Sequence, residues 1–149
     1  MKIFVAGAVS SAKKEQLEKY NIYKKILEET FEDLILTTPD DIWDYRNKCI
    51  DENPNFEKIS IDKLMVDYDL KQVKESDLII CDISEISTGM GIELGIAHEN
   101  NKKILFFYEK GSYISNMISG SFKDAHFIEY ANTDELVGKL KFELKNLYN

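Results

Sequence analysis

From residue 78 to residue 97 the chain reads LIICDISEISTGMGIELGIA. The apolar segment 78–83 is typical of a buried strand, and the run that begins at Ser87 predicts a helix directly after it. Two glycines at the start of that helix lack a Cβ, so a ligand can approach the backbone closely. A helix N-terminus also offers unpaired N–H groups, which favour an anion. Glu93, about one turn in, is therefore either placed to act on a bound substrate or is a surface carboxylate that the helix dipole stabilises.

Apolar runs and helical patterns alternate along the rest of the chain. Strands are predicted at residues 2–6, 34–37, 78–83, 103–108 and 126–130, and helices at 11–30, 42–49, 59–75, 89–101 and 133–148. Nearly continuous apolar strands separated by helices predict an α/β fold with a five-stranded parallel sheet, as in flavodoxin-like or Rossmann-like three-layer sandwiches. Ligands bind beyond the carboxyl ends of such strands, so residues 7–11, 82–93 and 109–115 are expected to border the site.

Composition narrows the classes of function. The length predicts a single domain over residues 1–149, and a net charge of −8 argues against binding to a nucleic acid polymer or to an anionic membrane. Cys49 and Cys81 match no metal-binding spacing and read as buried, reduced thiols. His98 and His126 match no metal motif either, so no metal is expected. The first residues do not resemble a signal peptide, and no apolar run approaches the ~20 residues of a membrane span, so we expect a cytoplasmic protein.

The reactive groups near the expected site are carboxylates. The turn at residues 7–11 lacks the GxGxxG pattern and the chain has no Walker motif, so no nucleotide cofactor is expected. Asp69 and Asp82 are possible partners of Glu93, because two carboxylates on opposite sides of a sugar can carry out double-displacement chemistry at the anomeric carbon. Asp69 can equally be a solvated helix residue, and Asp82 a turn or cap residue.

Five segments in order carry a resemblance to a known family. They are Ile3–Gly7, Asp67–Leu70, Ser76–Ile80, Ser87–Gly95 and Ile114–Gly120. Over nearly its whole length the chain resembles the nucleoside 2-deoxyribosyltransferase superfamily, which includes nucleoside monophosphate N-glycosidases. The resemblance implies that Glu93 is the nucleophile that forms a covalent glycosyl-enzyme intermediate, and that Asp69 contacts the base or handles its proton. It also implies a homodimer or larger assembly in which Ser115 reaches the neighbouring subunit's site.

Within the resemblance, single positions indicate the substrate. Ser87, Gly89 and Ser115 resemble the 5′-phosphate contacts of the nucleotide hydrolases, and Gly7 and Ser10 in the first turn are further candidate substrate contacts. The family's nucleotide hydrolases carry a serine and an arginine in that turn, where this chain has Ala8 and Ser10.

Phe4 stands where the family usually has a tyrosine. A phenylalanine at this position resembles the ribonucleotide hydrolases, so the preference between ribose and deoxyribose stays open. Ordinary strand packing explains Phe4 equally well.

The sequence thus predicts an N-glycosidase that acts on nucleoside or deoxynucleoside 5′-monophosphates, without cofactor or metal. One alternative is a nucleoside 2-deoxyribosyltransferase that exchanges bases on free deoxynucleosides, and another is a catalytically inactive nucleotide-binding domain. Residues 38–60 are expected to contribute to the base pocket, but base specificity stays open. In that segment Trp43 and Tyr45 are aromatic side chains that either stack on a base or pack in the core.

Overall fold

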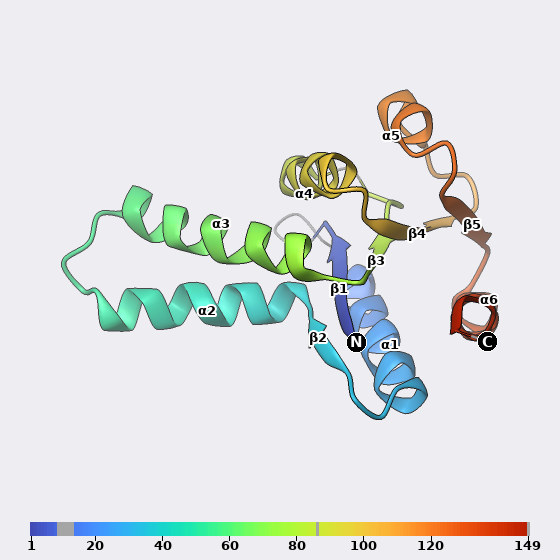
Figure 1. Ribbon diagram of the computed structural model, residues 1–149, viewed down its shortest axis with the longest axis horizontal. Coiled ribbons are helices and arrows are strands. Elements are labelled where there is room, and N and C mark those ends of the chain that lie inside the picture. The colour runs from blue at the N-terminus through green and yellow to red at the C-terminus, as the bar shows by residue number, and fades with distance from the viewer. Residues whose placement is uncertain (9–13, 86, 149) are drawn as a thin grey trace.

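The computed structural model describes residues 1–8, 14–85 and 87–148, and its centre is one parallel sheet. The strands are β1 (Lys2–Gly7), β2 (Ile35–Thr37), β3 (Leu78–Asp82), β4 (Lys103–Glu109) and β5 (His126–Tyr130). They lie in the order β2-β1-β3-β4-β5 (Figure 1), and every neighbouring pair is parallel. This flavodoxin-like order confirms the predicted α/β sheet and puts the switch point between β1 and β3.

Helices cover both faces of the sheet. They are α1 (Lys14–Thr30), α2 (Pro39–Glu52), α3 (Lys58–Glu75), α4 (Thr88–Glu99), α5 (Asn116–Ser121) and α6 (Thr133–Tyr148). Helices α1 and α6 pack on one face, whereas α3, α4 and α5 pack on the other (Figure 1). Within the described ranges, no helix is both long and apolar enough to cross a lipid bilayer.

The central strand β3 shows why this arrangement forms. Every residue of β3 is buried, because helices lie on both sides of it. Leu78 and Ile80 enter the core under α1 and α6, while Ile79 and Cys81 enter the core under α3 and α4. The pleat of the strand alternates its side chains between the two faces. Asp82 therefore belongs to the face of α1 and α6.

Helix α2 is longer than the predicted helix 42–49. Pro39 occupies the first helical position, where a missing N–H is harmless. The carboxylate of Asp41 accepts hydrogen bonds from the backbone N–H and the hydroxyl of Thr38, both at 2.7 Å. These contacts start the helix at residue 39, so that α2 and α3 form a long hairpin that extends away from the sheet (Figure 1).

Helix α5 was not predicted. Its six residues carry no helical periodicity that a sequence pattern can reveal. Ser115 begins it, and the Ser115 hydroxyl accepts the N–H of Met117 at 3.3 Å.

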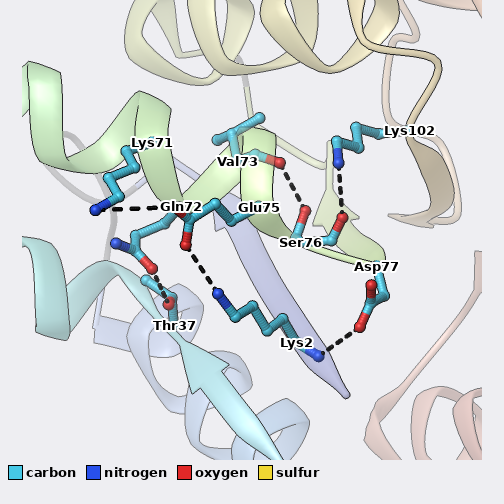
Figure 2. A network of polar contacts seen from close by, with 9 residues as sticks. All are labelled: Lys2, Thr37, Lys71, Gln72, Val73, Glu75, Ser76, Asp77 and Lys102. Atoms are coloured by element: carbon cyan, nitrogen blue, oxygen red, sulfur yellow. Dashed lines mark hydrogen bonds and ion pairs between the residues drawn. The ribbon is translucent and has the colours of Figure 1, made fainter.

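The C-terminal end of α3 is tied to the amino edge of the sheet (Figure 2). The backbone N–H of Lys2 donates to Asp77 at 2.8 Å, and the Lys2 ammonium donates to Glu75 at 2.8 Å. The ammonium of Lys102 donates to the carbonyl of Ser76 at 3.0 Å. These bonds fix α3 against β1 and β3, and they thereby fix the side chains that α3 carries two turns earlier.

Candidate active site

A cavity of about 170 Å³ lies against β1 on the face of α3 and α4. Six of the predicted site residues line it: Phe4, Gly7, Asp69, Ser87, Gly89 and Glu93. They come from β1, α3 and the start of α4, so residues far apart in the chain meet at one place. Two predicted residues are not among them. Ser10 lies outside the described residues, and Ser115 lines a different cavity.

The two carboxyl groups of the cavity are incompletely hydrogen-bonded. Asp69 Oδ1 and Glu93 Oε2 are buried atoms without a hydrogen-bond partner among the described residues. Burying such an acceptor without a partner costs about 1–3 kcal/mol, and native proteins contain few such atoms. Carboxyl oxygens left without a protein partner beside a cavity are typical of a site that a ligand completes.

Glu93 has a strongly shifted pKa. Burial is the largest cause, followed by the negative charge of Asp69 and a side-chain hydrogen bond to it, and together they raise the pKa of Glu93 to about 8. Burial also raises the pKa of Asp69, while its hydrogen bond to Glu93 acts in the opposite direction. Two neighbouring carboxyl groups cannot both ionise easily, so at neutral pH the pair holds one proton between them.

The start of α4 supplies polar groups to the cavity. Ser87 caps the helix, and its hydroxyl oxygen accepts the N–H of Met90 at 3.4 Å. A Cβ built on Gly89 would meet only the Ser87 hydroxyl, at 3.8 Å, so the space beside Gly89 is open to a ligand. A helix N-terminus with a free hydroxyl proton beside it can bind an anion.

Tyr20 lies where a side chain at position 7 would begin. A Cβ at this position would overlap the hydroxyl of Tyr20, which donates to the carbonyl of Ala8 at 3.2 Å. Ala8 itself is completely buried. Any other residue at position 7 would therefore require the Tyr20 side chain to move, and the main chain of Gly7 lines the cavity.

Phe4 forms part of the cavity wall and of the core. Its side chain is 2% exposed and packs with residues such as Ile79 and Phe106. Because phenylalanine has no hydroxyl, it offers no hydrogen bond to the unpartnered oxygen of Glu93. Both sequence readings of Phe4, packing and contact with substrate, are compatible with this position.

Ser115 lines a second cavity of about 300 Å³, on the other side of the start of α4. Ser87 and Met90 border both cavities, but Asp69 and Glu93 border only the first. Within one chain, Ser115 and the carboxyl pair therefore do not meet. The prediction that Ser115 serves a neighbouring subunit stays a prediction.

Asp82 is not the partner of Glu93. Its side chain is completely buried on the opposite face of the sheet and accepts hydrogen bonds from Tyr23 at 3.0 Å and Tyr130 at 2.7 Å. The backbone N–H of Ser84 donates to its second oxygen at 3.0 Å. The structure therefore selects Asp69 over Asp82 and gives Asp82 a structural role.

The cavity wall opposite β1 was only partly anticipated. Pro39, Ile42, Trp43, Met65, Val66 and Leu70 line it. The first three fall in segment 38–60, which was expected to contribute. The other three lie on α3: Met65 and Val66 are one turn before Asp69, and Leu70 follows it directly. Their helical spacing from Asp69 could have predicted that Met65 and Val66 share its face.

The histidines lie outside this cavity. The ring of His98 packs on Phe122 at 5.3 Å, and His126 contacts Glu143 at 2.8 Å. Among the described residues, no group of three His, Cys, Asp or Glu side chains is arranged to hold a metal ion.

Comparison with known proteins gives relatives in sequence. No family model matches the chain. The 5-hydroxymethyl-dUMP N-hydrolase of Esox lucius is 33% identical over 89 residues, which are 58% of this chain and 61% of that protein. The Homo sapiens protein of the same name is 32% identical over 68 residues, which are 44% of this chain and 39% of that protein. The chain spans 39–61% of the length of the curated relatives that it matches.

Solved structures share the fold. A CMP N-glycosidase of Clostridium botulinum superposes with a TM-score of 0.64 at 24% identity, over 96% of this chain and 99% of that chain. A 2-deoxyribosyltransferase of Bacillus psychrosaccharolyticus superposes with a TM-score of 0.65 at 20% identity, over 92% of this chain and 90% of that chain. These structures confirm the predicted fold, and the sequence relatives, which match part of the chain, support the resemblance to the nucleoside 2-deoxyribosyltransferase superfamily.

Proposed function

We propose that the protein is a cytoplasmic N-glycosidase that cleaves the base–sugar bond of nucleoside 5′-monophosphates. The observation that carries this proposal is the pair Asp69–Glu93, two interacting carboxyl groups in a cavity that Ser87 also lines. The names of sequence relatives, which are hydrolases of a nucleotide, add support. The free and buried thiols of Cys49 and Cys81 fit a reducing compartment.

Glu93 is the nucleophile and Asp69 the proton carrier. The hydrogen bond between them lets the shared proton move to Asp69, which leaves Glu93 as a carboxylate. A Glu93 oxygen then bonds to C1′ as the C1′–N bond breaks, and the base leaves with the electron pair and the proton of Asp69. Water next attacks C1′, gives its proton to Asp69 and releases Glu93 as a carboxylate. The pair is then back in its starting protonation state.

The start of α4 is the proposed phosphate site. Its N-terminal N–H groups and the hydroxyl proton of Ser87 are donors that an anion requires. Gly89 leaves room for the anion to approach. Arg46 is the chain's single arginine, and it pairs with Asp62 at 3.4 Å, so it is not offered as a phosphate ligand. Gly7 and Ser10 are proposed as further contacts from the first turn.

A second copy of the chain completes the proposed site through its Ser115. This follows the resemblance, and it is compatible with the separation of Ser115 from Glu93 within one chain. A mixing experiment tests it with the variants Glu93→Gln and Ser115→Ala. Each homodimer is impaired, but a mixed dimer has one site with both residues intact. Recovery of activity at low substrate concentration is expected, and no recovery on mixing would exclude a shared site.

A substrate panel tests the reaction. Base release is measured by chromatography with 5-hydroxymethyl-dUMP, dCMP, CMP and deoxyadenosine, each with and without free adenine as acceptor. We expect base release from monophosphates, at least about 10-fold faster than from the free nucleoside, because charge-assisted hydrogen bonds to phosphate are strong. Base exchange that does not depend on phosphate would identify a deoxyribosyltransferase instead. Nucleotide binding that raises the melting temperature without base release would identify an inactive binding domain.

Trapping tests the covalent step. A nucleoside 5′-monophosphate with fluorine on the 2′ carbon slows both steps, and mass spectrometry then locates the sugar. An adduct on Glu93 is expected, and Glu93→Gln should carry none. Turnover without any adduct, or an adduct on another residue, would contradict this mechanism.

A further inference from the structure

We infer that Trp43 is the surface on which the substrate's base stacks, and that the ion pair Arg46–Asp62 positions its indole ring. The inference deepens the proposed function and rests on it. Trp43 lines the same cavity as Asp69 and Glu93, and its side chain is 39% exposed. A partly exposed indole that lines the cavity beside the reacting carboxyl groups is suited to a flat aromatic ligand.

The neighbouring aromatic residue on α2 has a different role. Tyr45 stacks on Tyr68 of α3 with ring centroids 4.0 Å apart and planes inclined by 10°. Tyr45 joins the two helices of the hairpin and does not line the cavity of Asp69 and Glu93. The structure thus separates the two aromatic candidates of segment 38–60, one facing the cavity and one packed.

The Trp43 ring is held from outside the cavity. The guanidinium carbon of Arg46 lies 5.7 Å from the centre of the ring, which is within range of a cation–π contact. Arg46 donates through Nε and Nη2 to Asp62 of α3, both at 3.4 Å. The cation therefore fixes the indole relative to α3, the helix that also carries Asp69. A preorganised ring loses little conformational entropy when a base binds.

The surrounding wall favours stacking over hydrogen bonding. Pro39, Ile42, Met65, Val66 and Leu70 accompany Trp43, and all of them have apolar side chains. Among the described lining residues of α2 and α3, Asp69 is the single polar side chain. Apolar pockets discriminate between similar ligands by about 10- to 200-fold, far less than sites that pair hydrogen bonds. We therefore expect the protein to accept several bases.

Fluorescence of Trp43 tests the contact directly, because it is the chain's single tryptophan. The Glu93→Gln variant prevents turnover, and its emission is titrated with CMP, with 5-hydroxymethyl-dUMP and with ribose 5-phosphate. Both nucleotides should quench the emission, whereas ribose 5-phosphate, which lacks a base, should not. Equal quenching by ribose 5-phosphate, or none by a nucleotide that the wild-type protein cleaves, would overturn the assignment.

Kinetics of matched variants give a second test. Stacking of a base on an aromatic ring predicts that Trp43→Ala raises KM for nucleotides about 10- to 100-fold, with kcat changed only a few-fold. Trp43→Phe keeps a ring and should stay within about 3-fold of wild type. Tyr45→Phe is the control and should leave KM unchanged. Melting curves verify that each variant folds, and a Trp43→Ala variant that is folded with an unchanged KM would overturn the assignment.

Arg46→Met tests the positioning role. It keeps an unbranched apolar stem but removes the cation and its bond to Asp62, so KM should rise less than in Trp43→Ala and the emission maximum of Trp43 should shift. An unchanged spectrum and an unchanged KM would exclude a positioning role for Arg46.

Failure of the inference and failure of the proposed function are distinguishable. If nucleotides quench Trp43 but no base is released, the catalytic proposal fails and the stacking assignment stands. If base is released while Trp43→Ala has an unchanged KM, the stacking assignment fails and the catalytic proposal stands.

Discussion

Two carboxylate sites, the buried Asp82 and the partly buried pair Asp69–Glu93, lie on opposite faces of the same sheet, and they differ in how their oxygens are satisfied. Asp82 accepts hydrogen bonds from two tyrosine hydroxyls and one backbone N–H. Asp69 and Glu93 each keep a buried oxygen without a partner among the described residues. A fully paired buried carboxylate stabilises the fold around it, whereas an incompletely paired one raises the energy of the folded protein.

Only one of the two sites can exchange a proton with a ligand. The tyrosines around Asp82 leave it no room to exchange a proton with a ligand, because each of its oxygens already has a donor. The pair Asp69–Glu93 faces a cavity and holds a proton that it can give up near neutral pH. Perturbed carboxyl groups of this kind mark functional sites more often than structural ones.

The largest expected effect is the loss of activity in Glu93→Gln. A glutamine has nearly the same shape but cannot form the bond to C1′, so base release should fall at least about 10³-fold. Glu99→Gln, at the exposed end of the same helix, is the matched control and should keep wild-type turnover. If Glu93→Gln keeps activity within 10-fold of wild type, Glu93 is not the nucleophile, and the pair Asp69–Glu93 is not the reactive one of the two carboxylate sites.

The second effect concerns Asp82 and stability. Asp82→Ala leaves the buried Tyr23 hydroxyl without its acceptor, and we expect the free energy of unfolding to fall by about 3–5 kcal/mol. Urea unfolding measures this. Adding Tyr23→Phe to Asp82→Ala should recover part of the loss, because the orphaned hydroxyl is then removed. A loss below about 1 kcal/mol would mean that Asp82 is not the structural site that its hydrogen bonds indicate.

The third prediction concerns Glu93, where a substitution should raise the free energy of unfolding instead of lowering it. A folded-state pKa of about 8 for Glu93, against an ordinary value of 4.5, means that the folded protein binds more protons between these values. The free energy of unfolding of the wild type should therefore fall as pH rises from about 4.5 to 8. Glu93→Gln removes this dependence and should be more stable at pH 8 by roughly 3 kcal/mol, with little difference near pH 4. A variant that is less stable than wild type at pH 8 would contradict the pKa shift.

The smallest effect is a change in the shape of the pH–rate profile. If activity requires one proton on the pair, kcat/KM of the wild type should fall above about pH 8, as that proton is lost. In Asp69→Asn the charge and hydrogen bond of Asp69 are absent, so the pKa of Glu93 drops toward its ordinary value. The residual activity should then show no fall near pH 8. A falling limb that survives in Asp69→Asn would assign that pKa to another group.

Local sequence patterns predicted some features of the fold and the site. The five strands match the predicted apolar runs, and the signal is strongest in β1, β3 and β4, because burial on both faces requires continuous apolar sequence. The start of α2 was equally local, since Thr38, Pro39 and Asp41 form a typical N-terminal signature, but the helix was predicted only from residue 42. Helix α5 is too short for any period to be visible.

Local sequence is sufficient to predict the strands, the helix that begins after Ser87 and the carboxylate that this helix carries in its first turns. These follow from short-range periodicity and capping, which depend on neighbours in the chain. The packing of the helices on the sheet brings Glu93 to Asp69 and not to Asp82, and it places Trp43 and not Tyr45 at the cavity. The reason is physical: a pKa shift and an open ring face depend on which surfaces the packed helices bury, and local sequence does not contain that information.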